Sequence, residues 1–172
     1  MTAPLVVRDA ALSDVEDLKR INNAKASAVH RDRIRDAHES YIRYLVLEQR
    51  GTISGYCVLV FRRPPSWSDT ADGEHLPQVV DLYIEPEQRE RGLGTFFLRQ
   101  LESIVVNAGK NRLFIAVDPI GNPRVHALYL RLGYAPLERE PHRVHWHFVD
   151  SDGESHEGCD WSLTLRSSNL ST

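Results

Sequence analysis

The sequence contains only two cysteines in 172 residues, Cys57 and Cys159, and they lie far apart. Cys57 falls inside an apolar, strand-like segment, so a disulfide framework is not expected and a reducing compartment is the default. No apolar stretch is long enough to span a bilayer, and the first residues lack the charged and apolar regions of a secretion signal. We therefore expect a cytoplasmic protein without a membrane partner.

An excess of positive charge is also missing. The formal net charge is −3 and the sequence pI is about 6.2, so nucleic acid is not an expected partner, whereas a cationic small molecule is permitted. With 41% hydrophobic and 26% charged residues, the composition is that of a soluble globular protein. A length of 172 residues fits one domain, which we expect to span residues 1–172.

Two familiar phosphate-binding motifs are absent from the segment around which the chain is organised. The apolar run Val79–Ile84 predicts a buried strand, which Pro86 ends because proline lacks a ladder donor. A helical period begins at Leu93, and Arg89-x-x-Gly92-x-Gly94 lies between the two elements. This motif has neither the spacing of a P-loop nor the three glycines of the dinucleotide fingerprint.

Glycines at the start of this helix nevertheless predict an anion site. They leave backbone N–H groups uncovered at a point where no intrahelical partner exists. The helix dipole adds partial positive charge there, and Arg89 and Arg91 add full charge at the rim, which together suit a phosphate. The alternative interpretation is that Gly92 and Gly94 only allow close packing at the helix start.

The other elements follow from hydrophobic period and turn residues. We predict strands at 5–8, 41–48, 53–61 and 112–117, helices at 13–21, 26–42, 93–108 and 122–133, and a hairpin at 142–166. The strand at 112–117 follows the strand at 79–84 across a helix, so a right-handed crossover should make the two parallel. The long loop at 62–77 carries Trp67, which would line a substrate pocket or pin the loop to the body.

A cluster of charged residues, His30–Arg33, opens the second helix. It is either a solvated face or part of a lid that contacts the substrate.

A second motif follows the strand at 112–117. Asn122 and Pro123 open a helix at its N-cap and first position, Tyr129 lies on its buried face with Val125, and Gly133 closes it. Together with Arg89-x-x-Gly92-x-Gly94, this arrangement resembles the GNAT N-acetyltransferase superfamily over about a third of the chain. The resemblance implies an α/β fold (α+β in some schemes), with one mixed, twisted central sheet of about seven strands and helices on both faces.

The resemblance also implies roles for individual residues, with an acetyl-coenzyme A-binding core at 79–134. The strand end would pair with the pantetheine arm through the main chain of Leu82, Tyr83 and Ile84. The loop amides would hold the pyrophosphate, at Arg89, Glu90, Arg91, Gly92, Leu93, Gly94 and Thr95. Asn122 would bond the cofactor arm, or serve only as an N-cap. Tyr129 would protonate the departing thiolate, or serve only as an aromatic core residue.

Acyl transfer to nitrogen requires a deprotonated amine, because a free amine has a pKa near ~10. Asp81 is a carboxylate in an apolar strand and is a candidate for the base or for an anchor of the substrate ammonium. Strand alternation turns it away from the side of Leu82, so only a bulge would bring both into one site. Gln78, Glu74, His75 or a water chain are the other candidates for the base.

The C-terminal hairpin carries several histidines. His145 and His147 share a face, but no pair has a recognised ligand spacing, so we expect no metal. Asp150-x-Asp152-Gly153 predicts a turn rather than a calcium loop. An exposed terminal strand could pair with a second copy as a homodimer.

The sequence therefore predicts an N-acetyltransferase that uses acetyl-CoA as cosubstrate and acetylates a small-molecule amine by direct attack in a ternary complex. No covalent enzyme intermediate is needed, and neither cysteine is a convincing nucleophile. Two alternatives remain: a coenzyme A-binding sensor without turnover, and an acetyltransferase that acts on protein or peptide amino groups.

Overall fold

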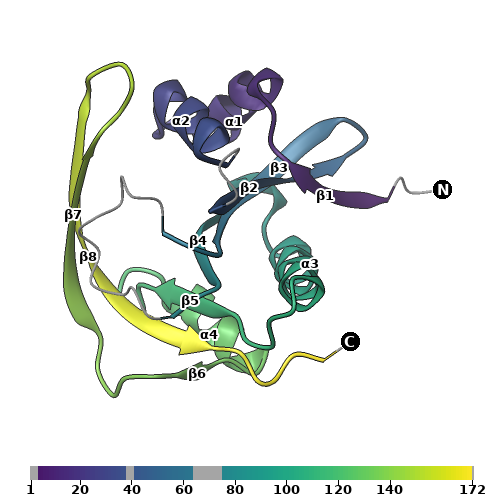
Figure 1. Cartoon of the computed structure of the whole chain (residues 1–172), viewed down its shortest axis with the longest axis vertical. Helices are drawn as coiled ribbons and strands as arrows, with labels where there is room; N and C mark the ends of the chain where they lie inside the picture. The colour runs from purple at the N-terminus through teal and green to yellow at the C-terminus, as the bar shows by residue number, and fades with distance from the viewer. Residues whose placement is uncertain (1–3, 38–40, 64–74, 172) are drawn as a thin grey trace.

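The computed structural model describes residues 4–37, 41–63 and 75–171, so Trp67 and Glu74 lie outside the described residues. A mixed sheet of eight strands forms the centre, in the order β1-β2-β3-β4-β5-β8-β6 with β7 paired to β8 (Figure 1). The strands are β1 (Leu5–Asp9), β2 (Ile42–Gln49), β3 (Thr52–Val60), β4 (Gln78–Ile84), β5 (Phe114–Val117), β6 (Ala135–Pro136), β7 (His142–Val149) and β8 (Ser155–Arg166). The helices are α1 (Val15–Ile21), α2 (Ser27–Ala37), α3 (Leu93–Asn107) and α4 (Pro123–Arg131), with short 3-10 turns η1 (Leu12–Asp14) and η2 (Pro86–Gln88).

The parallel pairing predicted between β4 and β5 is confirmed, and it is short. Only Gln78 with Phe114 and Val79 with Ile115 face each other in this parallel ladder. Beyond these pairs the two strands separate, so the end of β4 keeps one edge without a strand partner. This divergence lies next to the N-terminus of α3.

Helices cover both faces of the sheet, as predicted (Figure 1). The helices α1 and α2 pack on one face over a core that includes Leu18, Ile34 and Tyr56. The helix α3 packs on the other face through Phe97 and Leu101. Glu102 on α3 is also buried and accepts a hydrogen bond from Tyr134, at 2.9 Å between oxygens.

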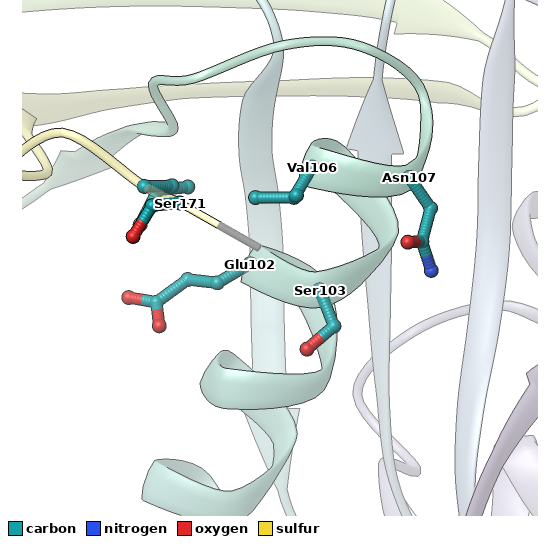
Figure 2. A pocket seen from close by; sticks show the side chains of 6 residues that line it. Glu102, Ser103, Val106, Asn107 and Ser171 are labelled. Carbon is teal, nitrogen blue, oxygen red and sulfur yellow. The ribbon is translucent and has the colours of Figure 1, made fainter.

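A shallow pocket lies along the C-terminal half of α3, where the C-terminal segment crosses it (Figure 2). Its lining residues are Glu102, Ser103, Val106, Asn107, Leu170 and Ser171. It lies at the opposite end of α3 from the predicted diphosphate site.

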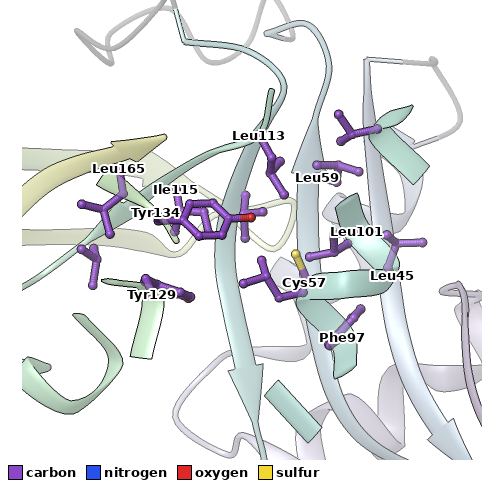
Figure 3. Packing of buried hydrophobic residues seen from close by; sticks show 14 of the residues in the cluster. Leu45, Cys57, Leu59, Phe97, Leu101, Leu113, Ile115, Tyr129, Tyr134 and Leu165 are labelled. Carbon is purple, nitrogen blue, oxygen red and sulfur yellow. The ribbon is translucent and has the colours of Figure 1, made fainter. Parts of the chain in front are cut away.

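The core between the sheet and α3 contains Cys57, Tyr129 and Tyr134 (Figure 3). Burial raises the pKa of the Cys57 thiol well above its usual value, so the thiol stays protonated and unreactive. This confirms Cys57 as a core residue.

Two local predictions are wrong. The pattern Ser13-x-x-Glu16 predicts a capping box at the start of the first helix. In the structure, Asp14 instead accepts a hydrogen bond from the N–H of Ala11 and binds Arg8. Val125 does not pack into the core, since its relative exposure is 38%.

The helix stop at Gly133 is confirmed by a left-handed φ of 92°, a conformation that glycine adopts without a Cβ clash.

The strands β7 and β8 form a long arm, and the N-terminal part of β8 pairs with β7 while its end pairs with β5 and β6. The predicted turn at its tip is confirmed, because one Asp150 oxygen accepts the N–H groups of Asp152 and Glu154. The tip contacts α2 through Arg31 with Asp152 and through Ser151 N–H with Asp32, both at 2.9 Å.

The end of β8 lies between β5 and β6, whereas its residues 155–162 pair only with β7 and keep the other edge without a strand partner among the described residues, so pairing with a second copy stays a prediction. Within the described part of the chain, no helix has both the length and the apolar character needed to cross a membrane.

Candidate active site

The N-terminus of α3 presents uncapped backbone N–H groups. Gly92 is the N-cap with φ of 78°, and no side chain caps the helix. The first helical hydrogen bond runs from Phe96 N–H to Gly92 C=O, so the N–H groups of Leu93, Gly94 and Thr95 have no helical acceptor. This arrangement suits an anion.

Close packing does not explain both glycines at this helix start. Gly92 needs its left-handed backbone. A Cβ on Gly94, however, would meet nothing nearer than Ile84 Cγ1 at 4.0 Å, which is ordinary contact. Packing within the protein therefore leaves room for a side chain at position 94, and a closely approaching ligand is the better explanation for its absence.

The unpaired edge of β4 lies beside this helix start. Glu85 N–H donates to Ser54 C=O of β3, so the peptide groups of Leu82 and Ile84 turn to the opposite edge. Tyr83 lies between them and turns its peptide toward β3, while its hydroxyl donates to Ile21 C=O at 3.1 Å. Of the three strand residues predicted to contact pantetheine, Leu82 and Ile84 present their main chain to the free edge, and Tyr83 does not.

The charged loop residues lie at the rim of this region. Arg89 donates from Nε to Ile84 C=O at 2.9 Å and lies over the Tyr83 ring. Arg91 donates to Gln88, and Glu90 pairs with Arg124 of α4 at 3.2 Å. Their side chains bind the protein itself, which leaves the backbone as the main contact that the loop offers to an anion.

Asp81 lies at a bulge in β4, which is the feature that the sequence required for Asp81 and Leu82 to contribute to one site. Its φ is 54°, and the register with β3 shifts between Tyr56 and Val58. Leu82 packs toward α3, whereas the Asp81 side chain reaches Lys25 and Arg33 on the α1–α2 side. The bulge therefore brings a carboxylate and a free strand edge to the same end of β4.

The ion pairs of Asp81 bear on its two predicted roles, which are a general base and an anchor of the substrate ammonium. Burial alone would raise its pKa, but the charges of Arg33 and Lys25 lower it below the usual value. A general base works best with a pKa near the operating pH. The lowered pKa of Asp81 therefore favours a permanently ionised anchor over a base.

Sequence reasoning missed Lys25 and misread part of the His30–Arg33 cluster. His30 is fully buried, and the Arg33 side chain is only 17% exposed and bound to Asp81, so a solvated face is the wrong interpretation for both. The available signal was Asp81 itself, because a carboxylate in an apolar strand requires a counter-charge.

His30 contacts aromatic side chains on α2's face of the sheet. Its Nδ1 shares a hydrogen bond with the Tyr44 hydroxyl at 2.7 Å, and its Nε2 has no hydrogen-bond partner among the described residues. Burial and the positive charges of Arg33 and Lys25 lower the pKa of His30 to about 4. The imidazole is therefore neutral at pH 7.

This neutral histidine predicts a loss of stability in mild acid. The folded pKa of about 4 lies below the unfolded value of ~6.5, so the contribution of His30 is complete above pH ~6.5 and is lost as pH falls toward 4. We expect the free energy of unfolding to fall by roughly 2 kcal/mol between pH 7 and pH 5 from this group alone. Urea unfolding at the two pH values measures it, and His30→Gln should remove that difference. An equal pH dependence in the variant would contradict the assignment.

Asn122 and Tyr129 occupy the ends of the predicted second motif. Asn122 is the N-cap residue of α4, but its side chain makes no capping hydrogen bond, so capping alone does not account for it. Tyr129 is buried, and no described residue hydrogen-bonds its hydroxyl. Burial raises the pKa of Tyr129 above its usual value, which keeps the hydroxyl protonated as an acid must be. Its burial also fits the alternative of a core residue.

The C-terminal histidines do not gather around one point. His145 Nε2 lies 3.6 Å from Cys159 Sγ, and His147 Nε2 lies 2.8 Å from Ser155 Oγ. Among the residues that the structure describes, no group of three or more His, Cys, Asp or Glu could hold a metal ion.

Known proteins are similar to this chain in sequence and in fold. The profile of the acetyltransferase (GNAT) family matches residues 12–134. A Bacillus subtilis protein provisionally named as a ribosomal protein bS18 alanine N-acetyltransferase is 27% identical over 142 residues, covering 79% of this chain and 84% of its own. Structural similarity extends to yncA of Salmonella typhimurium, provisionally assigned as an acetyltransferase and solved with its cofactor acetyl-CoA. The TM-score is 0.64 at 18% identity, over 97% of this chain and 94% of that one. A ribosomal-protein-alanine N-acetyltransferase of Brucella melitensis gives a TM-score of 0.66 at 17% identity, over 94% and 98% of the two chains.

These matches establish the class of protein. The chain belongs to the acetyltransferase (GNAT) family, because the family profile covers most of its length. The predicted family, the mixed sheet with helices on both faces and the acetyltransferase class are confirmed. The cofactor prediction agrees with the family, one member of which is solved with acetyl-CoA. The predicted small-molecule acceptor has less support than its alternative, since the named activities of two of these relatives are on a protein.

Proposed function

We propose that this protein is an acetyl-CoA-dependent N-acetyltransferase that acetylates the α-amino group at the start of a protein or peptide. The observation that carries the proposal is the uncapped N-terminus of α3 beside the unpaired edge of β4. The protein-acetylating names of the Bacillus and Brucella relatives support this acceptor.

Main-chain groups and one amide side chain hold the cofactor. The N–H groups of Leu93–Thr95 bind the diphosphate, and the peptide groups of Leu82 and Ile84 align the pantetheine arm as an added strand. Asn122 donates to the same arm from its uncommitted amide. The thioester is the acetyl donor when the cofactor is bound.

Transfer requires an oxyanion donor and an acid from this chain. The Ile84 N–H points to the free edge of β4 and stabilises negative charge on the carbonyl oxygen. The Tyr129 hydroxyl gives its proton to the sulfur of the departing thiolate. The amine attacks directly, and its proton leaves through water, because the ionised Asp81 is already held by two cations.

A small-molecule amine is the second candidate acceptor. The contacts of the β7–β8 tip with α2 favour it, because a bulky acceptor entering there would have to break them. Both candidates share the cofactor site and differ only in what approaches from the α1–α2 side. We also propose that the protein acts in the cytoplasm, where its free cysteines would remain reduced.

A thiol-release assay tests the proposal. Peptides with free N-termini, matched peptides with blocked N-termini, polyamines, amino acids and aminoglycosides are each offered with acetyl-CoA. We expect thiol release with the free peptides and a mass increase of one acetyl group at their α-amino nitrogen. Tight cofactor binding with no acetylation of any acceptor would instead indicate a coenzyme A sensor.

A further inference from the structure

Two cations share one carboxylate oxygen at the bulge of β4. Arg33 Nη1 lies 2.6 Å and Lys25 Nζ lies 3.0 Å from the same oxygen, Asp81 Oδ2. The Lys25 and Asp81 side chains are 22% and 30% exposed, so this part of the group is accessible, whereas Arg33 is only 17% exposed. An ammonium and a guanidinium carry several N–H donors each, and Asp81 accepts one from each of them. Donors therefore remain for a further anion.

The charges of this cluster do not cancel. Lys25 and Arg33 contribute two positive charges, whereas Asp81 contributes one negative charge and the buried His30 is neutral. Arg20 pairs with Glu85 and Arg31 with Asp152. Lys19, whose charge also acts on His30, donates to the main-chain oxygens of Asn23 and Lys25. Burial is the largest cause of the lowered pKa of His30, and the two cations lower it further by more than Asp81 raises it, which agrees with this surplus.

The surplus lies where the acceptor must approach. Asp81 is adjacent to Leu82, whose main chain faces the free edge of β4, and the cations come from α1–α2 on the side opposite α3. A cationic amine alone is repelled at this place. An acceptor that also carries an anion gains an attraction of the kind that ion pairs near a protein surface provide.

We infer that Lys25 and Arg33, held by Asp81, select an acceptor with a carboxylate a few bonds from the reacting amine. This inference rests on the proposed N-acetyltransferase function, and it applies to both candidate acceptors, the peptide and the small-molecule amine. The carboxylate comes from one of two sources: an acidic side chain at the second position of a peptide, or the α-carboxylate of a free amino acid. In either case Lys25 and Arg33 are specificity-determining residues, and Asp81 positions them.

Matched acceptors test the inference. One pair consists of peptides that begin Ala-Glu and Ala-Gln, and the other pair consists of alanine and alaninamide. We expect kcat/KM to be about tenfold or more higher for the acidic member of one pair. The difference in kcat/KM appears in the peptide pair if the anion is a side chain. It appears in the amino-acid pair if the anion is an α-carboxylate.

Variants separate this selectivity from folding. Lys25→Gln should bring the acidic-to-amide ratio of the responding pair close to one. Lys25→Glu should favour a peptide that begins Ala-Lys over Ala-Glu. Arg35→Gln is the control, because Arg35 is an exposed cation on α2, the helix of Arg33, and it pairs with Asp32 at 3.8 Å. It should keep the wild-type ratio.

Ratios near one for both pairs in an enzyme that does acetylate them would overturn the inference and leave the proposed function standing. A ratio that survives Lys25→Gln and Lys25→Glu unchanged would also overturn it. Failure to acetylate any acceptor would overturn the proposed function itself, and the inference with it.

Discussion

Replacing Tyr129 with phenylalanine is expected to lower kcat about a hundredfold, with little change in the KM for acetyl-CoA. The ring is buried in the core beside α3, so phenylalanine keeps the packing and removes only the hydroxyl (Figure 3). No described residue hydrogen-bonds that hydroxyl, so its loss leaves no protein partner unpaired. The effect should therefore fall on the chemical step, which steady-state kinetics with a peptide acceptor measures.

Tyr134 supplies the matched control for this prediction. Its ring centroid lies 6.1 Å from that of Tyr129, but its hydroxyl is bound to Glu102. Tyr134→Phe should reduce the free energy of unfolding by about 1 kcal/mol and leave kcat nearly unchanged. If Tyr129→Phe retained full kcat, or if both variants lost activity equally, Tyr129 would be a core residue and not the acid.

Gly94→Asp is expected to raise the KM for acetyl-CoA at least about a hundredfold without destabilising the fold. A carboxylate in the first turn of α3 interacts favourably with the helix dipole, so the helix should be as stable as before or slightly more stable. The same carboxylate would lie at the N–H groups that bind the diphosphate, and like charges repel. Calorimetric titration with coenzyme A and thermal unfolding separate the two effects.

Gly94→Ala is the control for added bulk. Its Cβ meets only ordinary contact within the protein, so the fold should keep its stability. Because the ligand approaches position 94 closely, cofactor affinity should fall, but much less than in Gly94→Asp, since no charge is added. Unchanged affinity in Gly94→Asp would show that the diphosphate does not bind at this helix start.

Local rules explain which parts of the fold could be predicted from the sequence. The crossover from β4 through α3 to β5 has a clear change of period and boundary residues that agree with it. Gly133 marks a helix end because only its backbone geometry is needed there. The two glycines at the start of α3 point to an anion site for the same reason, since free N–H groups follow from helix geometry alone.

Tertiary contacts explain what the sequence did not reveal. The Arg33–Asp81 pair joins residues 48 positions apart, and no local pattern identifies such a partner. The bulge at Asp81 leaves the hydrophobic alternation of β4 almost unchanged. The sequence therefore showed only that a bulge was needed to bring Asp81 and Leu82 into one site, and not that the bulge exists. The burial of Glu102 likewise depends on Tyr134, which arrives from beyond α4.

The most direct test of the central claim is a structure of the protein with coenzyme A bound. The account predicts diphosphate oxygens within hydrogen-bonding distance of the backbone N–H groups of Leu93, Gly94 and Thr95, with the pantetheine arm along Leu82 and Ile84. A diphosphate held only by side chains away from this helix start would contradict it.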